Sequence, residues 1–232
     1  MTTALLIAAL VVAATAVGLR LSLWRSHPAS RAMTITLALL MLGALLTHPT
    51  IIASEWLDHA TPDEIHLANF SNLIGDLVEV AAAGMLLITV GRAWGRVRFV
   101  RRMVGVFAVI AVAMIVLYAY SDAPFEPTRY LGELDGPARV FVWVSAGTVL
   151  VANAAVLASL AYSLPVSDRS TRIALLPMMI GAAIGAALML VQIVGLFHSD
   201  PYNSWAWPLA VAMVFAYALS GVLGYFQLRR LP

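Results

Sequence analysis

Residues 67–90 read LANFSNLIGDLVEVAAAGMLLITV, an apolar run of membrane-spanning length that carries two amides and two carboxylates. Drawn on a helix at 100° per residue, these four side chains (Asn69, Asn72, Asp76 and Glu79) fall within roughly 80° of one another. A carboxylate inside a membrane costs about 2.5–3.5 kcal/mol on insertion scales, so such residues normally face a protein interior or a water-filled cavity. The stretch therefore predicts a buried helix with one polar face, around which the other helices are arranged.

The composition of the whole chain points to the same class of protein. Of the 232 residues, 62% are apolar and only 11% are charged, whereas about 25% of the residues in a soluble domain are charged. Apolar runs of about 20 residues, the length of a transmembrane helix, recur from end to end. We predict an all-α polytopic membrane protein with one transmembrane domain, residues 1–232, built as a bundle of seven helices.

The charges give the predicted bundle an orientation. The expected spans cover residues 3–24, 32–54, 67–92, 103–120, 138–164, 172–197 and 205–228. With the N-terminus outside, 12 of the 14 arginines lie on the inner side and nine of the 12 acidic residues lie on the outer side. Cytoplasmic loops carry such an excess of basic residues. We therefore expect a multi-pass protein of the bacterial inner (plasma) membrane with a cytoplasmic C-terminus.

Missing residue types exclude several chemistries. The chain has no cysteine and no lysine, which excludes disulfides, thiolate ligands, a lysine Schiff base and a P-loop lysine. Only one of the five histidines, His48, lies inside a predicted span, so neither a zinc site nor a haem with two histidine ligands is expected. We predict no enzyme, no catalytic residue, no metal, no cofactor and no binding of nucleic acid.

The polar face of residues 67–90 is the main candidate site. At 1.5 Å per residue, Asp76 lies roughly 12 Å and Glu79 roughly 16 Å below the outer end of its helix. Burial penalises the charged form of a carboxyl group, so such groups can hold a proton at neutral pH. The neighbouring spans offer His48 and Gln192 at a similar depth. The hypothesis is an intramembrane polar or proton site made of His48, Asn69, Asn72, Asp76, Glu79 and Gln192.

Each of these positions also has a structural interpretation. The two carboxyl groups could be protonated or hydrogen-bonded links between helices. His48 precedes a proline, and its ring could bond a carbonyl that the proline leaves free. Asn153, in the predicted span 138–164, is expected to form a hydrogen bond between helices.

Two further features have both a structural and a functional interpretation. The small residues Gly181 and Gly185 lie one turn apart, and small residues allow helices to approach closely. They predict either packing within the bundle or a docking face for another membrane protein. The second feature is the cluster of arginines at residues 92–102. This basic cluster indicates the cytoplasmic side and is also a candidate site for anionic lipid headgroups. Its headgroup candidates are Arg96, Arg98, Arg101 and Arg102.

The layout resembles an uncharacterised family of seven-helix integral membrane proteins of actinobacteria that carry a transporter label. The resemblance rests on a first span ending in LRLSLW at residues 19–24, a short turn flanked by arginines, a third span that starts Leu-Ala-Asn69-Phe, and an arginine-rich link after it. It covers about the whole chain and implies a transporter. A gene of an actinobacterial phage or mobile element would have the same composition.

Two classes of function follow. The first is a small transporter or proton-linked membrane protein that uses Glu79 as its main protonatable group. The second is an accessory or inhibitory protein that docks on a larger membrane complex, such as a respiratory or transport assembly. The expected partners are the lipid bilayer and either such a complex or further copies of this chain.

Overall fold

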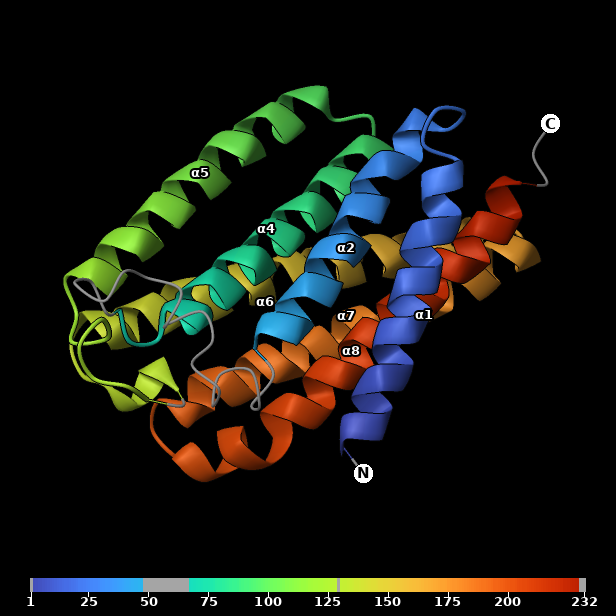
Figure 1. The fold of residues 1–232 in the computed structure, drawn as a ribbon. Coiled ribbons are helices and arrows are strands. Elements are labelled where there is room, and N and C mark those ends of the chain that lie inside the picture. Colours follow the sequence, from blue (N-terminus) through green and yellow to red (C-terminus); the bar gives the residue numbers. More distant parts are fainter. Residues whose placement is uncertain (1, 48–66, 129, 230–232) are drawn as a thin grey trace.

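The computed structural model describes residues 2–47, 67–128 and 130–229. These residues form seven α-helices and contain no strand (Figure 1). The helices are α1 (Thr2–Ser22), α2 (Arg31–Leu46), α4 (Phe70–Ala93), α5 (Val97–Ala119), α6 (Pro137–Ser163), α7 (Arg169–Gly195) and α8 (Ser199–Leu228). Single 3₁₀ turns lie at Pro28–Ser30, Leu131–Glu133 and Leu164–Val166. The predicted all-α class is confirmed for this part of the chain.

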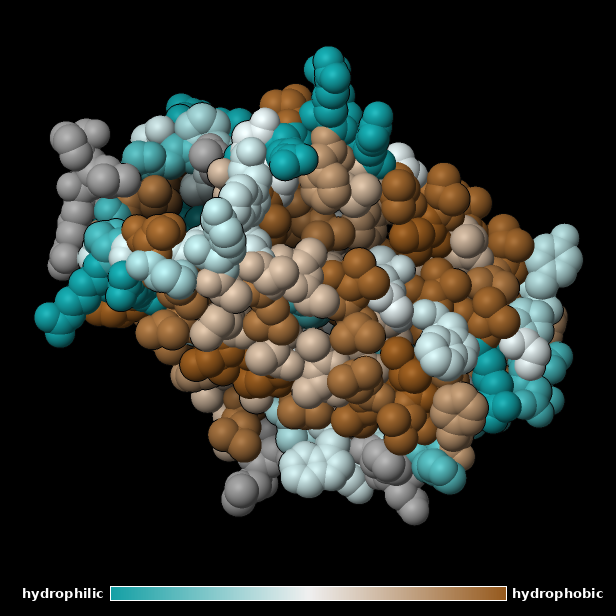
Figure 2. All heavy atoms as spheres, turned by 180° about the vertical axis from the view of Figure 1, so that it is seen from behind, coloured by the Kyte–Doolittle hydropathy of each residue, from teal (hydrophilic) through white to brown (hydrophobic). Residues whose placement is uncertain are grey.

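Six of the helices are long and apolar enough to cross a membrane, with mean hydropathies of 1.9–2.3 over their spans. The seventh, α2, is apolar too but has only 16 residues. Figure 2 shows a broad apolar surface that separates hydrophilic side chains at opposite ends of the bundle. A bilayer core about 30 Å thick requires such helices and such a surface. The chain therefore has the make-up of a multi-pass integral membrane protein.

Three helix boundaries lie six or more residues from their predicted positions. α5 begins at Val97 instead of residue 103, so Arg98, Arg101 and Arg102 belong to its first turns. Arginine is a good helix former and can extend its charged end out of the apolar layer, so a basic cluster need not end a helix. α8 begins at Ser199 and includes most of the expected outer turn. α2 ends at Leu46, before the predicted residue 54, and residues 48–54 lie outside the described part of the chain.

The helices α6, α7 and α8 meet around one buried hydrogen bond. The hydroxyl of Tyr217 on α8 donates to Oδ1 of Asn153 on α6 at 2.8 Å. The amide nitrogen of Asn153 donates to the carbonyl of Val149 in its own helix, so both ends of this buried side chain have partners. The predicted interhelical hydrogen bond of Asn153 is confirmed.

The small residues of α7 lie against this hydrogen bond. A Cβ atom placed on Gly185 would lie 2.7 Å from Oδ1 of Asn153, and one on Gly181 would lie 3.0 Å from the ring of Tyr217. Both glycines are buried. The structure therefore places them inside the bundle, where they allow α7 to approach α6 and α8 closely, and not on a face that another protein could reach.

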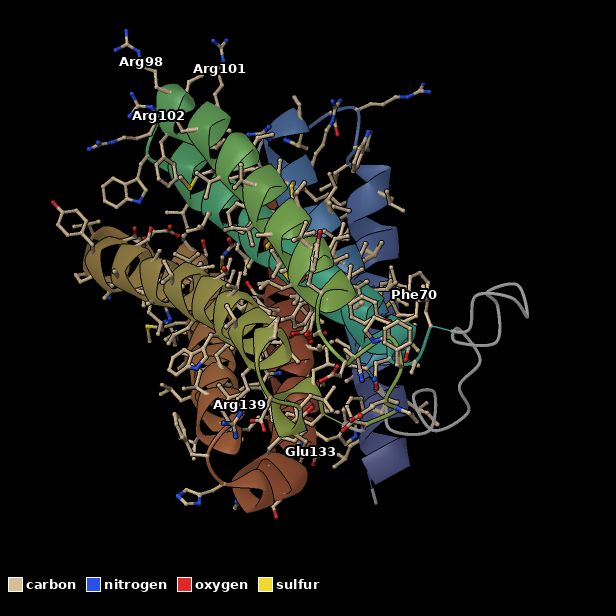
Figure 3. All side chains as sticks on the ribbon, turned by 90° about the vertical axis from the view of Figure 1, so that its left-hand side faces the viewer. Phe70, Arg98, Arg101, Arg102, Glu133 and Arg139 are labelled. Carbon is tan, nitrogen blue, oxygen red and sulfur yellow. The ribbon has the colours of Figure 1, made fainter. Side chains whose placement is uncertain are left out.

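A cluster of arginine side chains lies at one end of the bundle. Figure 3 shows Arg98, Arg101 and Arg102 there, and Glu133 and Arg139 at the opposite end. We term the first the arginine end and the second the acidic-loop end. At the arginine end the buried side chain of Arg20 donates to the carbonyls of Gly221 and Ser30, at 3.3 and 3.5 Å. These contacts join α1 to α8 and to the turn before α2, because a buried guanidinium group needs acceptors.

Asp168 caps the start of α7 at the arginine end. Its carboxylate accepts hydrogen bonds from the backbone N–H groups of Ser170 and Thr171, at 3.1 and 3.4 Å. Hydrogen bonds from Ser170, and secondarily from Thr171, lower the pKa of Asp168 to about 2. An ionised carboxylate at a helix N-terminus binds N–H groups that have no partner within the helix.

Asp168→Ala should therefore lower the Tm of the detergent-solubilised protein at pH 7. Because the pKa of Asp168 in the folded state lies below its ordinary value of 3.8, its contribution to stability is complete above about pH 4 and is lost as the pH falls toward 2. Circular dichroism melts at several pH values measure the difference. Asp168→Asn, which keeps an acceptor, should retain part of the stability at pH 7. An equal effect of Asp168→Ala at pH 7 and pH 2 would contradict this role.

Candidate functional site

Asn69 holds the start of α4 against the loop between α5 and α6. It precedes the first helical residue and has a left-handed backbone with φ of 58°, which asparagine tolerates better than most residues. Its amide nitrogen donates to the carbonyls of Ala123 and Glu126 at 2.8 and 2.7 Å, and the N–H of Thr128 donates to its Oδ1 at 3.0 Å. Asn69 therefore anchors this loop from the position just before the first residue of α4.

The same loop brings an aromatic pair to the acidic-loop end. The hydroxyl of Tyr130 donates to the backbone carbonyl of Gln192 on α7 at 2.5 Å. The ring of Tyr130 stacks on that of Tyr202 in the first turn of α8, with ring centres 3.9 Å apart. The pair has room because a Cβ atom on Gly195 would lie 2.9 Å from Cβ of Tyr202. We term Tyr130 and Tyr202 the tyrosine pair.

Asp76 and Glu79 lie one turn apart on α4, and both are partly buried. The Cγ atom of Glu79 rests on α2, 3.3 Å from where a Cβ atom of Gly43 would lie. One turn away from that contact, a Cβ on Gly75 would lie 2.6 Å from Cγ2 of Thr47, so α2 and α4 approach each other closely. Within the described residues neither carboxylate has a hydrogen bond or an ion pair.

The electrostatics link the two carboxylates to the tyrosine pair. Burial raises the pKa of Tyr202, and the negative charges of Asp76 and Glu79 add to this shift. Burial also raises the pKa of Tyr130, again with a contribution from Asp76. A neighbouring negative charge disfavours ionisation of a phenol, because the phenolate would carry a second negative charge. Asp76, on the second turn of α4, and the tyrosine pair therefore lie toward the same end of the bundle.

The predicted site residues are brought together only in part. Asp76 and Glu79 share a face of α4, and Asn72 lies on the same helix with its amide nitrogen 3.5 Å from Oδ1 of Asn69. The backbone carbonyl of Gln192 accepts the hydrogen bond from the hydroxyl of Tyr130. His48 lies outside the described residues. Among the described residues, no group of three or more possible metal ligands is present.

The predicted headgroup residues lie apart from this site. Arg96, Arg98, Arg101 and Arg102 are all exposed at the arginine end (Figure 3). None of them forms an ion pair within the described residues. They are therefore placed to face lipid headgroups or solvent.

The tyrosine pair was missed by the sequence reasoning. Tyr130 lies in a loop rich in proline and acidic residues, and Tyr202 lies in a stretch that was expected to be a turn. Neither the helical spacing of apolar residues nor the charge pattern marks them. The available signal was Gly132 and Gly195, which leave space for the tyrosine rings, but the partners of a glycine are not visible in one sequence.

Comparison of the chain with family models, with curated proteins and with solved structures gives no match. The function is therefore argued from the site alone.

Proposed function

We propose that this chain is a small proton- or cation-linked transport protein that uses Glu79 and Asp76 as its ion-binding groups. The observation that carries the proposal is the position of two carboxylates on one face of a membrane helix without a hydrogen bond or ion pair among the described residues. Two negative charges in such a place are costly unless a proton or a cation accompanies them. Interhelical links, the structural alternative, would need donors on the facing helices.

The surroundings of the pair support an ion path from the acidic-loop end. Asp76 lies nearer the start of α4 at the acidic-loop end, and Glu79 lies one turn deeper, against Gly43 of α2. The tyrosine pair, which the hydroxyl of Tyr130 anchors on α7, lies at the same end of the bundle. An entering ion would reach Asp76 before Glu79.

The charge distribution gives the proposed path a direction. The arginine end is assigned to the cytoplasm of a bacterial inner membrane, because basic residues are retained on that side. The tyrosine pair then faces outward.

Flux through the purified protein tests the proposal. The protein is reconstituted in liposomes that contain a pH-sensitive dye, and a potassium gradient with valinomycin sets the membrane potential. The expected result is a proton flux above that of empty liposomes, or a flux of Na⁺ that disappears when choline replaces Na⁺. Rates equal to those of empty liposomes for both ions, with folded protein present in the membrane, would reject the proposed function.

A further inference from the structure

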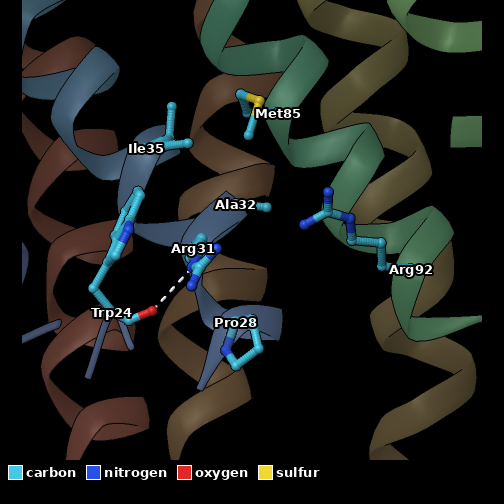
Figure 4. A pocket seen from close by; sticks show the side chains of 7 residues that line it. All are labelled: Trp24, Pro28, Arg31, Ala32, Ile35, Met85 and Arg92. Carbon is cyan, nitrogen blue, oxygen red and sulfur yellow. Dashed lines mark hydrogen bonds between the residues drawn. The ribbon is translucent and has the colours of Figure 1, made fainter. Parts of the chain in front are cut away.

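A pocket of about 520 Å³ opens at the arginine end, between the turn before α2 and the last turns of α4 (Figure 4). Its volume falls within the range of about 300–1,000 Å³ that is typical of small-molecule sites. Two of its walls carry a guanidinium group, Arg31 on α2 and Arg92 on α4. Among the described residues, no acidic side chain lines it. We term it the arginine pocket.

Arg31 is held in place by the end of the preceding segment. Its Nε donates to the backbone carbonyl of Trp24 at 2.9 Å, and its guanidinium lies 5.4 Å from the centre of the Trp24 ring. This contact fixes the plane of the guanidinium. The two terminal amino groups of Arg31 have no hydrogen bond within the described residues, and the same is true of the Arg92 side chain. Figure 4 shows both arginines reaching toward the same space from α2 and α4.

The pocket changes from charged to apolar along the helices. Ile35 lies one turn beyond Arg31 on α2, and Met85 lies two turns before Arg92 on α4. Because α2 begins and α4 ends at the arginine end, both apolar residues lie on the side of the arginines that leads toward the centre of the bundle. Figure 4 shows Ile35 and Met85 together at that side. A ligand that fits such walls has an anionic group at one end and a hydrocarbon group at the other.

We propose that the arginine pocket binds an anionic phospholipid, with its phosphate between Arg31 and Arg92 and an acyl chain along Ile35 and Met85. Arginine holds phosphate oxygens with two parallel hydrogen bonds, which the unoccupied amino groups of both residues can supply. Basic pockets between transmembrane helices are known sites for such headgroups. A free phosphate compound would share the anionic contact but would leave the apolar wall unused.

Native mass spectrometry of the protein in mixed micelles tests this site. The probes are phosphatidylglycerol and phosphatidylcholine with identical acyl chains, and inorganic phosphate is the soluble control. The protein is compared with Arg92→Gln, which removes a charge from an exposed side chain of the pocket. Arg98→Gln is the matched control, because it removes the same charge from the same end of the bundle outside the pocket.

The expected result is selective retention of phosphatidylglycerol, weakened about five-fold by Arg92→Gln, the effect of one basic residue near an anionic headgroup. Arg98→Gln should change binding much less. Equal losses in the two variants would assign binding to the diffuse charge of the whole surface and overturn the pocket. Equal retention of both lipids would also overturn it. The Tm of the protein is also measured with each ligand. If inorganic phosphate raises the Tm as much as phosphatidylglycerol does, the ligand is a soluble phosphate and the lipid is rejected.

Discussion

Glu79→Gln should reduce the ion flux of the reconstituted protein roughly ten-fold or more, because a positioned proton-transfer group contributes at least that factor. The substitution keeps the size and the hydrogen-bonding capacity of the side chain and removes only its ability to gain and lose a proton or to neutralise a cation. Since Glu79 lies against Gly43 and has no hydrogen bond to any other described residue, the exchange should not disturb the packing of α2 on α4. Flux in liposomes and the Tm in detergent measure the two effects separately.

Glu126→Gln is the control for this experiment. Glu126 is an exposed acidic residue of the loop at the acidic-loop end, and its backbone carbonyl, not its side chain, accepts the hydrogen bond from Asn69. The control should keep the flux of the unmodified protein. If Glu79→Gln also keeps it, Glu79 is not part of the path. If both variants lose flux equally, the effect comes from the surface charge of the outer side.

Gly185→Leu should prevent the accumulation of folded protein. A Cβ atom at this position would lie 2.7 Å from Oδ1 of Asn153 and 2.9 Å from Sδ of Met213, and leucine adds three more carbon atoms. The side chain would separate α7 from α6 and α8 and break the hydrogen bond between Tyr217 and Asn153. Overpacking of a core costs about 1–3 kcal/mol and sometimes more, and an unpaired buried amide adds to that cost. The yield of monodisperse protein after extraction measures the effect.

Gly105→Leu is the matched control for the packing experiment. Gly105 lies on the exposed side of α5, where a Cβ atom would have no heavy atom within 4 Å. This variant should express like the unmodified protein. A Gly185→Leu variant that folds normally would contradict the close packing of α7. If such a variant also lost a membrane partner, the glycine stripe formed by Gly181 and Gly185 would be a docking surface. The accessory function would then be favoured.

The helical class could be predicted from the sequence because it depends on composition and on runs of apolar residues. The expected spans are stretches of about 20 residues or more that carry few charges. Six of the seven helices in the described part of the chain correspond to such stretches, and α2 is shorter. The helix ends were less predictable. Arg98 and Arg101 were expected in a link but lie inside α5, because the long arginine side chain can leave the apolar layer while its backbone stays helical.

The site was only partly predictable for a different reason. The shared face of Asp76 and Glu79 follows from helical geometry, which is local. The loop contacts of Asn69 and the stacking of Tyr130 on Tyr202 join residues that are more than 50 positions apart, and no periodic pattern records such contacts. The glycine stripe of α7 predicted close packing, but one sequence does not say which helix face it meets.

The proposed function requires the carboxyl pair of α4 to bind a proton or a cation. Infrared difference spectroscopy of the reconstituted protein tests it most directly, since carboxyl and carboxylate groups absorb at different frequencies. The spectra are recorded while the pH is changed and while Na⁺ is exchanged for choline. We expect a carboxyl signal that responds to one of these changes and is absent in the Asp76→Asn/Glu79→Gln double variant. A signal that is identical in the double variant, or no response to either ion, would contradict it.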